Sequence, residues 1–241
     1  MFRFLLDSVS FTTTTTKSLI GAGAYFHLIT ATNVPISVNG VSSFQGLVTS
    51  SSPIQSNKLH PMFISGFADG EASFYLKITP SLTNKTGWSV QACFSIGLHK
   101  KDQALLELIQ LSLEGVGKIT KNKTKNSVHY EVRSLKELTE VIITHFDKYP
   151  LNTQKRADYE LFKIAVNKMN KKEHLTLEGI QQIVNIKVSM NKNDLSDSLR
   201  TTFPNISPVT RPLVTQYPES LDLNWFAGFA SAESCFFCGD F

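Results

Sequence analysis

Two segments far apart in the chain carry the same pattern: Phe63–Phe74 reads FISGFADGEASF, and Trp225–Phe236 reads WFAGFASAESCF. Each contains Gly-Phe-Ala, a glutamate three residues after the alanine, and a phenylalanine three residues after the glutamate. One copy alone is weak evidence. Two copies in register, separated by far more than the period of a solenoid, indicate a duplicated domain.

Each copy predicts a short helix that runs directly into a strand. Small residues recur four positions apart on one helix face, Gly66 with Gly70 and Gly228 with Ala232. Such pairs allow two helix backbones to approach closely. Close packing would offset the cost of glycine inside a helix, about 0.5–1 kcal/mol relative to alanine. We therefore expect the two helices to pack against each other through these residues.

Glu71 and Glu233 would then end two helices that lie side by side. The C-terminal end of a helix favours cations by about 0.3–1 kcal/mol, and two like charges close together add to the penalty. A bound divalent cation would relieve both effects, and carboxylate oxygens suit Mg²⁺. A metal ion between two carboxylates and a phosphate is an arrangement that cleaves phosphodiesters. The alternative is that both glutamates are ordinary surface residues.

Both segments resemble the motif of the LAGLIDADG homing endonucleases, in the single-chain type with two motifs per polypeptide. The eighth motif position, which holds the metal-binding carboxylate in the family, is Glu71 in one copy and Glu233 in the other. The sixth position differs between the copies, Asp69 against Ser231, and the ninth, usually Gly, is Ala72 and Ser234. Three further stretches resemble fungal mitochondrial members: Leu98–Asp102, His145–Lys155 and Lys172–Leu175.

The resemblance covers about residues 59–241 and implies an α+β fold whose half-domain follows the order αββαββα. Alternating apolar and polar residues predict strands near 73–78, 88–96 and 128–133, and a shorter strand at 118–120. Leucines and isoleucines at helical spacing predict helices at 102–113 and 135–146, with two more at 153–169 and 175–190.

The predicted organisation has four parts. Residues 1–57, with the run Thr12–Thr16, form a disordered or low-complexity leader; 58–190 form the first half-domain; 191–222, rich in proline, form a linker. Residues 223–241 begin a second half-domain and supply only its motif helix. We expect a truncated product in which Trp225 and the nearby phenylalanines lack partners to bury them.

Composition adds modest constraints. Residues 58–213 hold 22 Lys and Arg against 15 Asp and Glu, a mild basic excess that suits a polyanionic partner. Cys93, Cys235 and Cys238 make no disulfide framework, and we expect no metal or redox role for the Cys-x-x-Cys pair. The apolar stretch 19–38 is interrupted by polar residues and proline, so no membrane span is expected.

The polar faces of the strands are the expected DNA-reading surface, because the family reads DNA with its sheet and a β-ribbon fits the major groove. Alternation alone favours the interpretation that this is simply a solvated sheet face. The pair of motifs favours a DNA-reading surface instead. The candidates for base contact are Tyr75, Lys77, Thr79, Ser89, Gln91, Ser95, Lys118 and Thr120. Lys121 and Lys123, in a lysine-rich hairpin, are expected to contact phosphates.

The resemblance implies a monomeric, mitochondrial, intron-encoded endonuclease that hydrolyses double-stranded DNA at a specific site with Mg²⁺. Glu71 and Glu233 would hold the metal, and Lys155, in a matched family segment, would stabilise phosphate charge. Two alternatives stay open for a chain of this length: a maturase-like protein that binds host intron RNA without cleaving DNA, and an inert fragment.

Overall fold

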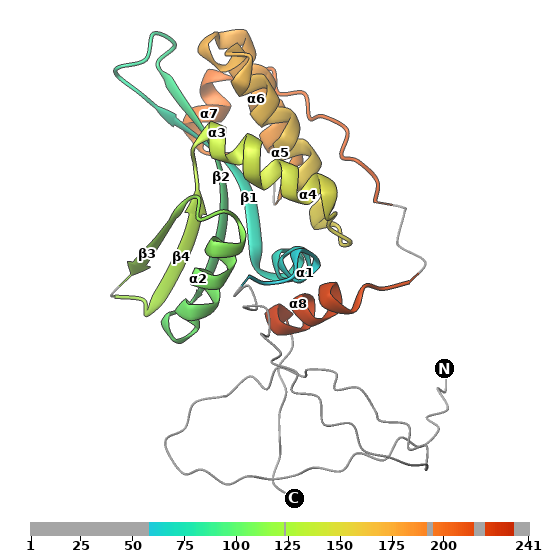
Figure 1. Cartoon of the computed structure of the whole chain (residues 1–241). Helices are drawn as coiled ribbons and strands as arrows, with labels where there is room; N and C mark the ends of the chain where they lie inside the picture. The colour runs from blue at the N-terminus through green and yellow to red at the C-terminus, as the bar shows by residue number, and fades with distance from the viewer. Residues whose placement is uncertain (1–57, 123, 192–194, 215–219, 234–241) are drawn as a thin grey trace, which may run out of the picture. The chain divides into compact units, whose positions relative to one another are not determined.

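The structure is a computed structural model, and it describes residues 58–122, 124–191, 195–214 and 220–233 (Figure 1). By their contacts, all of the described residues belong to one compact unit. The predicted leader, Lys123 and the cysteines Cys235 and Cys238 lie outside the described residues. The predicted domain boundaries stay a prediction.

The described strands form a four-stranded antiparallel sheet in the order β1-β2-β4-β3. One face is apolar because side chains alternate along each strand: Phe74, Leu76 and Ile78 are buried, while Ser73, just before them, and Lys77 are exposed. The strands are β1 (Ala72–Pro80), β2 (Trp88–His99), β3 (Lys118–Asn122) and β4 (Ser127–Val132).

Helices precede, separate and follow the strand pairs in the predicted order αββαββα, so the predicted α+β fold is confirmed. A π-helical turn, Leu138–Ile143, joins two short helices where the sequence predicts one. The helices are α1 (Pro61–Glu71), α2 (Gln103–Ser112), α3 (Leu135–Glu137), α4 (Thr144–Lys148), α5 (Lys155–Asn170), α6 (Leu177–Ser189), α7 (Asp197–Thr202) and α8 (Leu223–Glu233), with 3₁₀ turns at Lys100–Asp102 and Glu173–Leu175.

The core lies between the apolar face of the sheet and the helices α4, α5 and α6, which run along that face in Figure 1. Phe74 of β1 is at its centre, with ring centroids 5.2–5.5 Å from those of four other aromatic residues. These partners are Phe94, Phe146, Tyr159 and Phe162. Within the described residues, no helix combines the length and the apolar character needed to cross a bilayer.

In the C-terminal third, the structure adds detail to the predicted linker and corrects the expectation for Trp225. The predicted linker contains α7, and Leu195, Leu199 and Phe203 of that region are buried in the core. Arg211 then pairs with Asp158 of α5, at 2.5 and 3.0 Å, so this stretch packs on the half-domain. Trp225 does not lack a partner: its side chain is 6% exposed. By contrast, Phe226 is 52% exposed, as expected of an unpartnered aromatic residue.

Candidate active site and nucleic-acid interface

The two motif helices, α1 and α8, pack directly against each other (Figure 1). A Cβ atom added to Gly66 would lie 1.9 Å from the carbonyl oxygen of Trp225, and one added to Gly228 would lie 2.1 Å from that of Phe63. Further along, a Cβ on Gly70 would meet the Cβ of Ala232 at 2.4 Å. The close approach therefore requires small residues at these positions.

This packing brings Glu71 and Glu233, which end α1 and α8, close enough for their charges to interact. Burial and the charge of Glu233 raise the pKa of Glu71, and the nearby Lys155 opposes the shift. Glu233 also passes beside Gly70, because its Oε1 would lie 3.3 Å from a Cβ at that position. The two carboxylates repel each other at this end of the helix pair.

Lys155, at the start of α5, reaches the C-terminal end of α1. Its ammonium group donates hydrogen bonds to the carbonyl oxygens of Ala68, at 3.0 Å, and Gly70, at 2.7 Å. The Ala68 carbonyl also accepts the backbone N–H of Ala72. Carbonyl oxygens at this end of α1 form the negative end of the helix dipole, so the cation stabilises it. Burial lowers the pKa of Lys155, while Asp69, Glu233 and Glu71 act in the opposite direction.

The donor set at this end suits a hard divalent cation. Among the described residues, no group of three or more His, Cys, Asp or Glu side chains is gathered as a metal site. Mg²⁺ is commonly held by one or two carboxylates, with water and substrate phosphate completing its shell, so two glutamates are sufficient. Oxygen donors and a net carboxylate repulsion both favour a hard cation.

Asp69 is a structural carboxylate whose role the sequence did not reveal. It is 5% exposed, and burial raises its pKa although several hydrogen bonds to it act in the opposite direction. It accepts hydrogen bonds from the amides of Asn152 (2.7 Å) and Thr153 (3.3 Å), from the Thr153 hydroxyl (2.6 Å) and from the Trp225 indole (2.9 Å).

The difference between the two motif copies at the sixth position follows from these contacts. Asp69 joins α1 both to the segment before Lys155 and to α8. Its counterpart Ser231 donates to the carbonyl of Ala227, at 2.7 Å, within its own helix. The sequence signal for this role was an aspartate inside an apolar helix, at the position where the second copy has Ser231.

The second face of the sheet carries polar residues in rows set by the strand register. One row crosses all four strands through Ser73, Ser95, Glu131 and Lys118. The predicted DNA-reading residues share this face. In β1 and β2, Tyr75 lies opposite Cys93, Lys77 opposite Gln91 and Thr79 opposite Ser89, and in β3 Thr120 lies opposite His129 of β4.

Exposure differs among these candidates. Lys77, Lys118 and Thr120 are exposed, and the side chains of the remaining candidates are half-buried. Lys121 is exposed too, but alternation along β3 places it with Ile119 on the opposite face. Lys123 lies outside the described residues.

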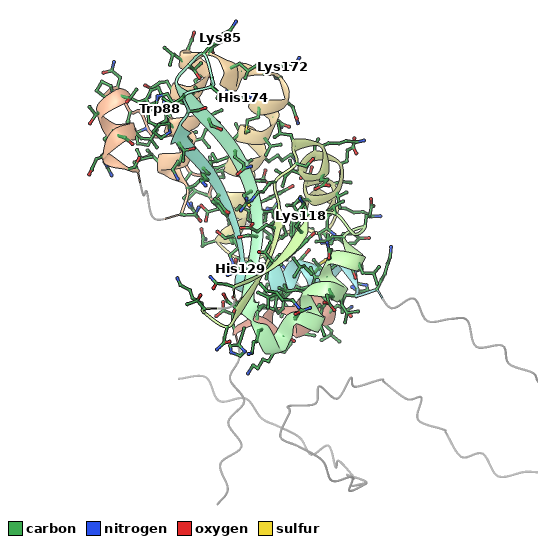
Figure 2. All side chains as sticks on the ribbon, turned by 90° about the vertical axis from the view of Figure 1, so that its left-hand side faces the viewer. Lys85, Trp88, Lys118, His129, Lys172 and His174 are labelled. Carbon is green, nitrogen blue, oxygen red and sulfur yellow. The ribbon has the colours of Figure 1, made fainter. Side chains whose placement is uncertain are left out.

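Strand β4 adds residues to this face that the sequence did not single out as candidates. Ser127, His129 and Glu131 alternate with buried apolar residues, and Arg133 follows them. Figure 2, which turns the left-hand side of Figure 1 toward the viewer, labels His129 and Lys118. A Cβ on Gly97 would lie 2.9 Å from Nδ1 of His129, so this glycine makes room for the imidazole ring.

A four-stranded antiparallel sheet with an open polar face, joined to two close-packed helices that end in carboxylates, defines the class of protein. Residues 64–166 match the LAGLIDADG endonuclease family, so this part of the chain belongs to that family.

Curated relatives come from fungi. The chain is 44% identical over 179 residues to the probable intron-encoded endonuclease 3 of Neurospora crassa, covering 74% of this chain and 33% of the relative. It is 41% identical over 188 residues to the probable intron-encoded endonuclease 2 of the same species, covering 74% of this chain and 41% of the relative. The chain thus spans less than half the length of these relatives.

Solved structures agree with this assignment. The I-SmaMI LAGLIDADG homing endonuclease bound to cleaved DNA superimposes with a TM-score of 0.69 at 40% identity, over 73% of this chain and 57% of that one. The meganuclease I-CpaMI bound to uncleaved DNA gives 0.68 at 45% identity, over 73% and 58%.

Proposed function

We propose that the chain acts as a site-specific endonuclease on double-stranded DNA. The observation that carries the proposal is the packing of α1 on α8, which brings Glu71 and Glu233 together beside Lys155. The relatives I-SmaMI and I-CpaMI are described as bound to DNA, which supports the same class of substrate here.

In this proposal Glu71 and Glu233 hold Mg²⁺ through carboxylate oxygens. I-SmaMI has been observed with uncleaved DNA in the presence of calcium ions, which supports a divalent-cation site in the family. When bound, such an ion activates a water molecule and stabilises the leaving oxygen of a phosphodiester.

The protein's own contribution is position and charge. The glycine contacts hold the two carboxylates at a fixed separation, and Asp69 orients the segment that carries Lys155. The ammonium group of Lys155 interacts with both glutamates, and in this position it would stabilise the added negative charge of a phosphate. The polar face of the sheet supplies base contacts, with Lys77, Gln91, Lys118 and Thr120 as donors or acceptors in the major groove.

We further infer that the protein originates in a fungal mitochondrial genome, since its relatives include intron-encoded proteins and a mitochondrial protein of yeast. We propose that the endonuclease is monomeric and uses Mg²⁺ as its cofactor. The alternative partner to double-stranded DNA is intron RNA.

The test separates catalysis from binding. The Glu71→Gln variant keeps the size of the side chain but removes a metal ligand, so cleavage of a selected target should fall at least about a hundredfold while DNA affinity changes little. The matched control is Glu140→Gln, which alters an exposed glutamate 3.9 Å from Lys136 on a helix. Cleavage by Glu71→Gln at the rate of the control would contradict the proposal.

A further inference from the structure

Glu131 occupies an unexpected position for a carboxylate. It lies in the middle of the polar face of the sheet, opposite Ser95 on one side and Lys118 on the other. A negative charge on a surface that meets DNA is unfavourable next to phosphates. A structural or functional partner is therefore expected for it.

The contacts of Glu131 identify those partners. Its Oε2 accepts a hydrogen bond from Nη2 of Arg133 at 2.5 Å, and its Oε1 accepts one from the phenol of Tyr75 at 3.4 Å. Burial raises the pKa of Tyr75, so the phenol stays protonated and remains a donor at neutral pH. The carboxylate is thus engaged from two directions.

Exposure distinguishes the two members of the ion pair. The side chain of Arg133 is 51% exposed and that of Glu131 is 21% exposed. The guanidinium is therefore open to a ligand, while the carboxylate is largely covered. An ion pair with an exposed guanidinium adds little to folding stability. A contribution to stability therefore does not explain why this position holds a carboxylate.

The pair is well suited to selecting a base. A guanidinium has five N–H donors. Arg133 uses Nη2 for Glu131 and also interacts with the Cys93 side chain, and its remaining donors are available for the O6 and N7 acceptors of guanine. A free arginine at this place would bind phosphates equally well at every sequence. The adjacent carboxylate repels phosphate, and it limits the orientations of the guanidinium.

We propose that Arg133 reads a guanine in the DNA target and that Glu131 is the positioning residue that keeps Arg133 from binding phosphate instead. This inference rests on the proposed function and adds two specificity residues on β4 to it. Tyr75 serves as the second support of the carboxylate, which gives this candidate a role other than direct base contact.

The experiment is selection of bound targets by the full chain from a library of random double-stranded DNA, with parallel titrations of non-specific DNA at several salt concentrations. Glu131→Gln keeps the shape but removes the charge. Its preference for guanine at one position should fall about tenfold. Its non-specific affinity should rise, and the slope of log affinity against log salt should steepen by up to about 0.9, the contribution of one new phosphate contact.

A second variant and a control complete the design. Arg133→Gln should lose the same guanine preference without any gain in non-specific affinity, and Glu140→Gln should match the parent chain. An unchanged preference in Glu131→Gln, or a loss spread over all positions of the target, would overturn the inference while leaving the endonuclease proposal standing. Failure of the parent chain to select any sequence would overturn both.

Discussion

At the scale of single residues, Glu71 links the electrostatics of the site to its stability. Its pKa is raised because the charged form is partly buried and lies close to Glu233, so this group destabilises the folded chain as the pH rises through that pKa. Glu71→Gln removes the repulsion and should raise the melting temperature at pH 7 by about 1–2 °C in the absence of divalent cations.

Addition of millimolar Mg²⁺ should reverse the order of the two proteins. The parent chain gains stability from a bound ion, and the variant gains less because it has lost a ligand. Thermal melts of both proteins with and without Mg²⁺ measure this. Equal stabilisation of both by Mg²⁺ would argue against Glu71 as a ligand.

His145 provides a separate pH dependence. Burial lowers its pKa to about 4, from 6.5 for the free side chain, and its ring packs edge-on against Phe146. Between these two pH values the unfolded chain binds more protons than the folded one, so stability is complete above 6.5 and is lost as the pH falls toward 4. The loss attributable to His145 is at most about 3 kcal/mol.

The matched variant is His145→Phe, which keeps an aromatic ring at this position and cannot titrate. Its free energy of unfolding, measured by denaturant titration at pH 7, 5.5 and 4.5, should fall less than that of the parent chain. Parallel pH profiles for the two proteins would show that His145 is not a source of the acid sensitivity.

At the scale of elements, the docking of α8 on α1 depends on one buried polar contact as well as on the glycines. Trp225 donates to Asp69 at 2.9 Å in a buried setting. A hydrogen bond to a charged group contributes about 1.5–3 kcal/mol. Trp225→Phe keeps an aromatic ring and loses the donor, so it should destabilise the contact by an amount in that range.

A double-mutant cycle with Asp69→Asn tests whether the two residues act together. We expect a coupling energy of at least about 1 kcal/mol in the free energy of unfolding, because each single change disrupts the same bond. Hydrogen exchange of residues 223–233 should rise in both single variants. Strictly additive effects would indicate that α8 docks without this bond.

The sequence predicted the paired motif helices because their signal is local: small residues at helical spacing and a glutamate at the same place in each copy. The role of Asp69 could not be predicted because its partners are more than 80 residues away in sequence: Asn152, Thr153 and Trp225. The helix α7 was not predicted because its six residues are too few to show a helical hydrophobic period in a stretch rich in proline.

At the scale of the whole molecule, alternation along the strands predicted which residues share a face, and the α+β order followed from it. The register between strands was not predictable, so the neighbours of each residue were unknown. Tyr75 and Glu131, 56 residues apart, meet only because β2 lies between β1 and β4. The register also pairs His129 with Gly97, and no sequence pattern predicts this pairing.

We propose that the two motif helices assemble a metal-dependent, site-specific nuclease, and cleavage of a random double-stranded DNA library tests this proposal. The full chain is incubated with the library in Mg²⁺ or in EDTA, and the ends of the cut molecules are sequenced. We expect cuts within one family of related sequences in Mg²⁺, none in EDTA, and none with Glu71→Gln. Cutting that persists in EDTA or in the variant, or an uncut library in Mg²⁺, would contradict it.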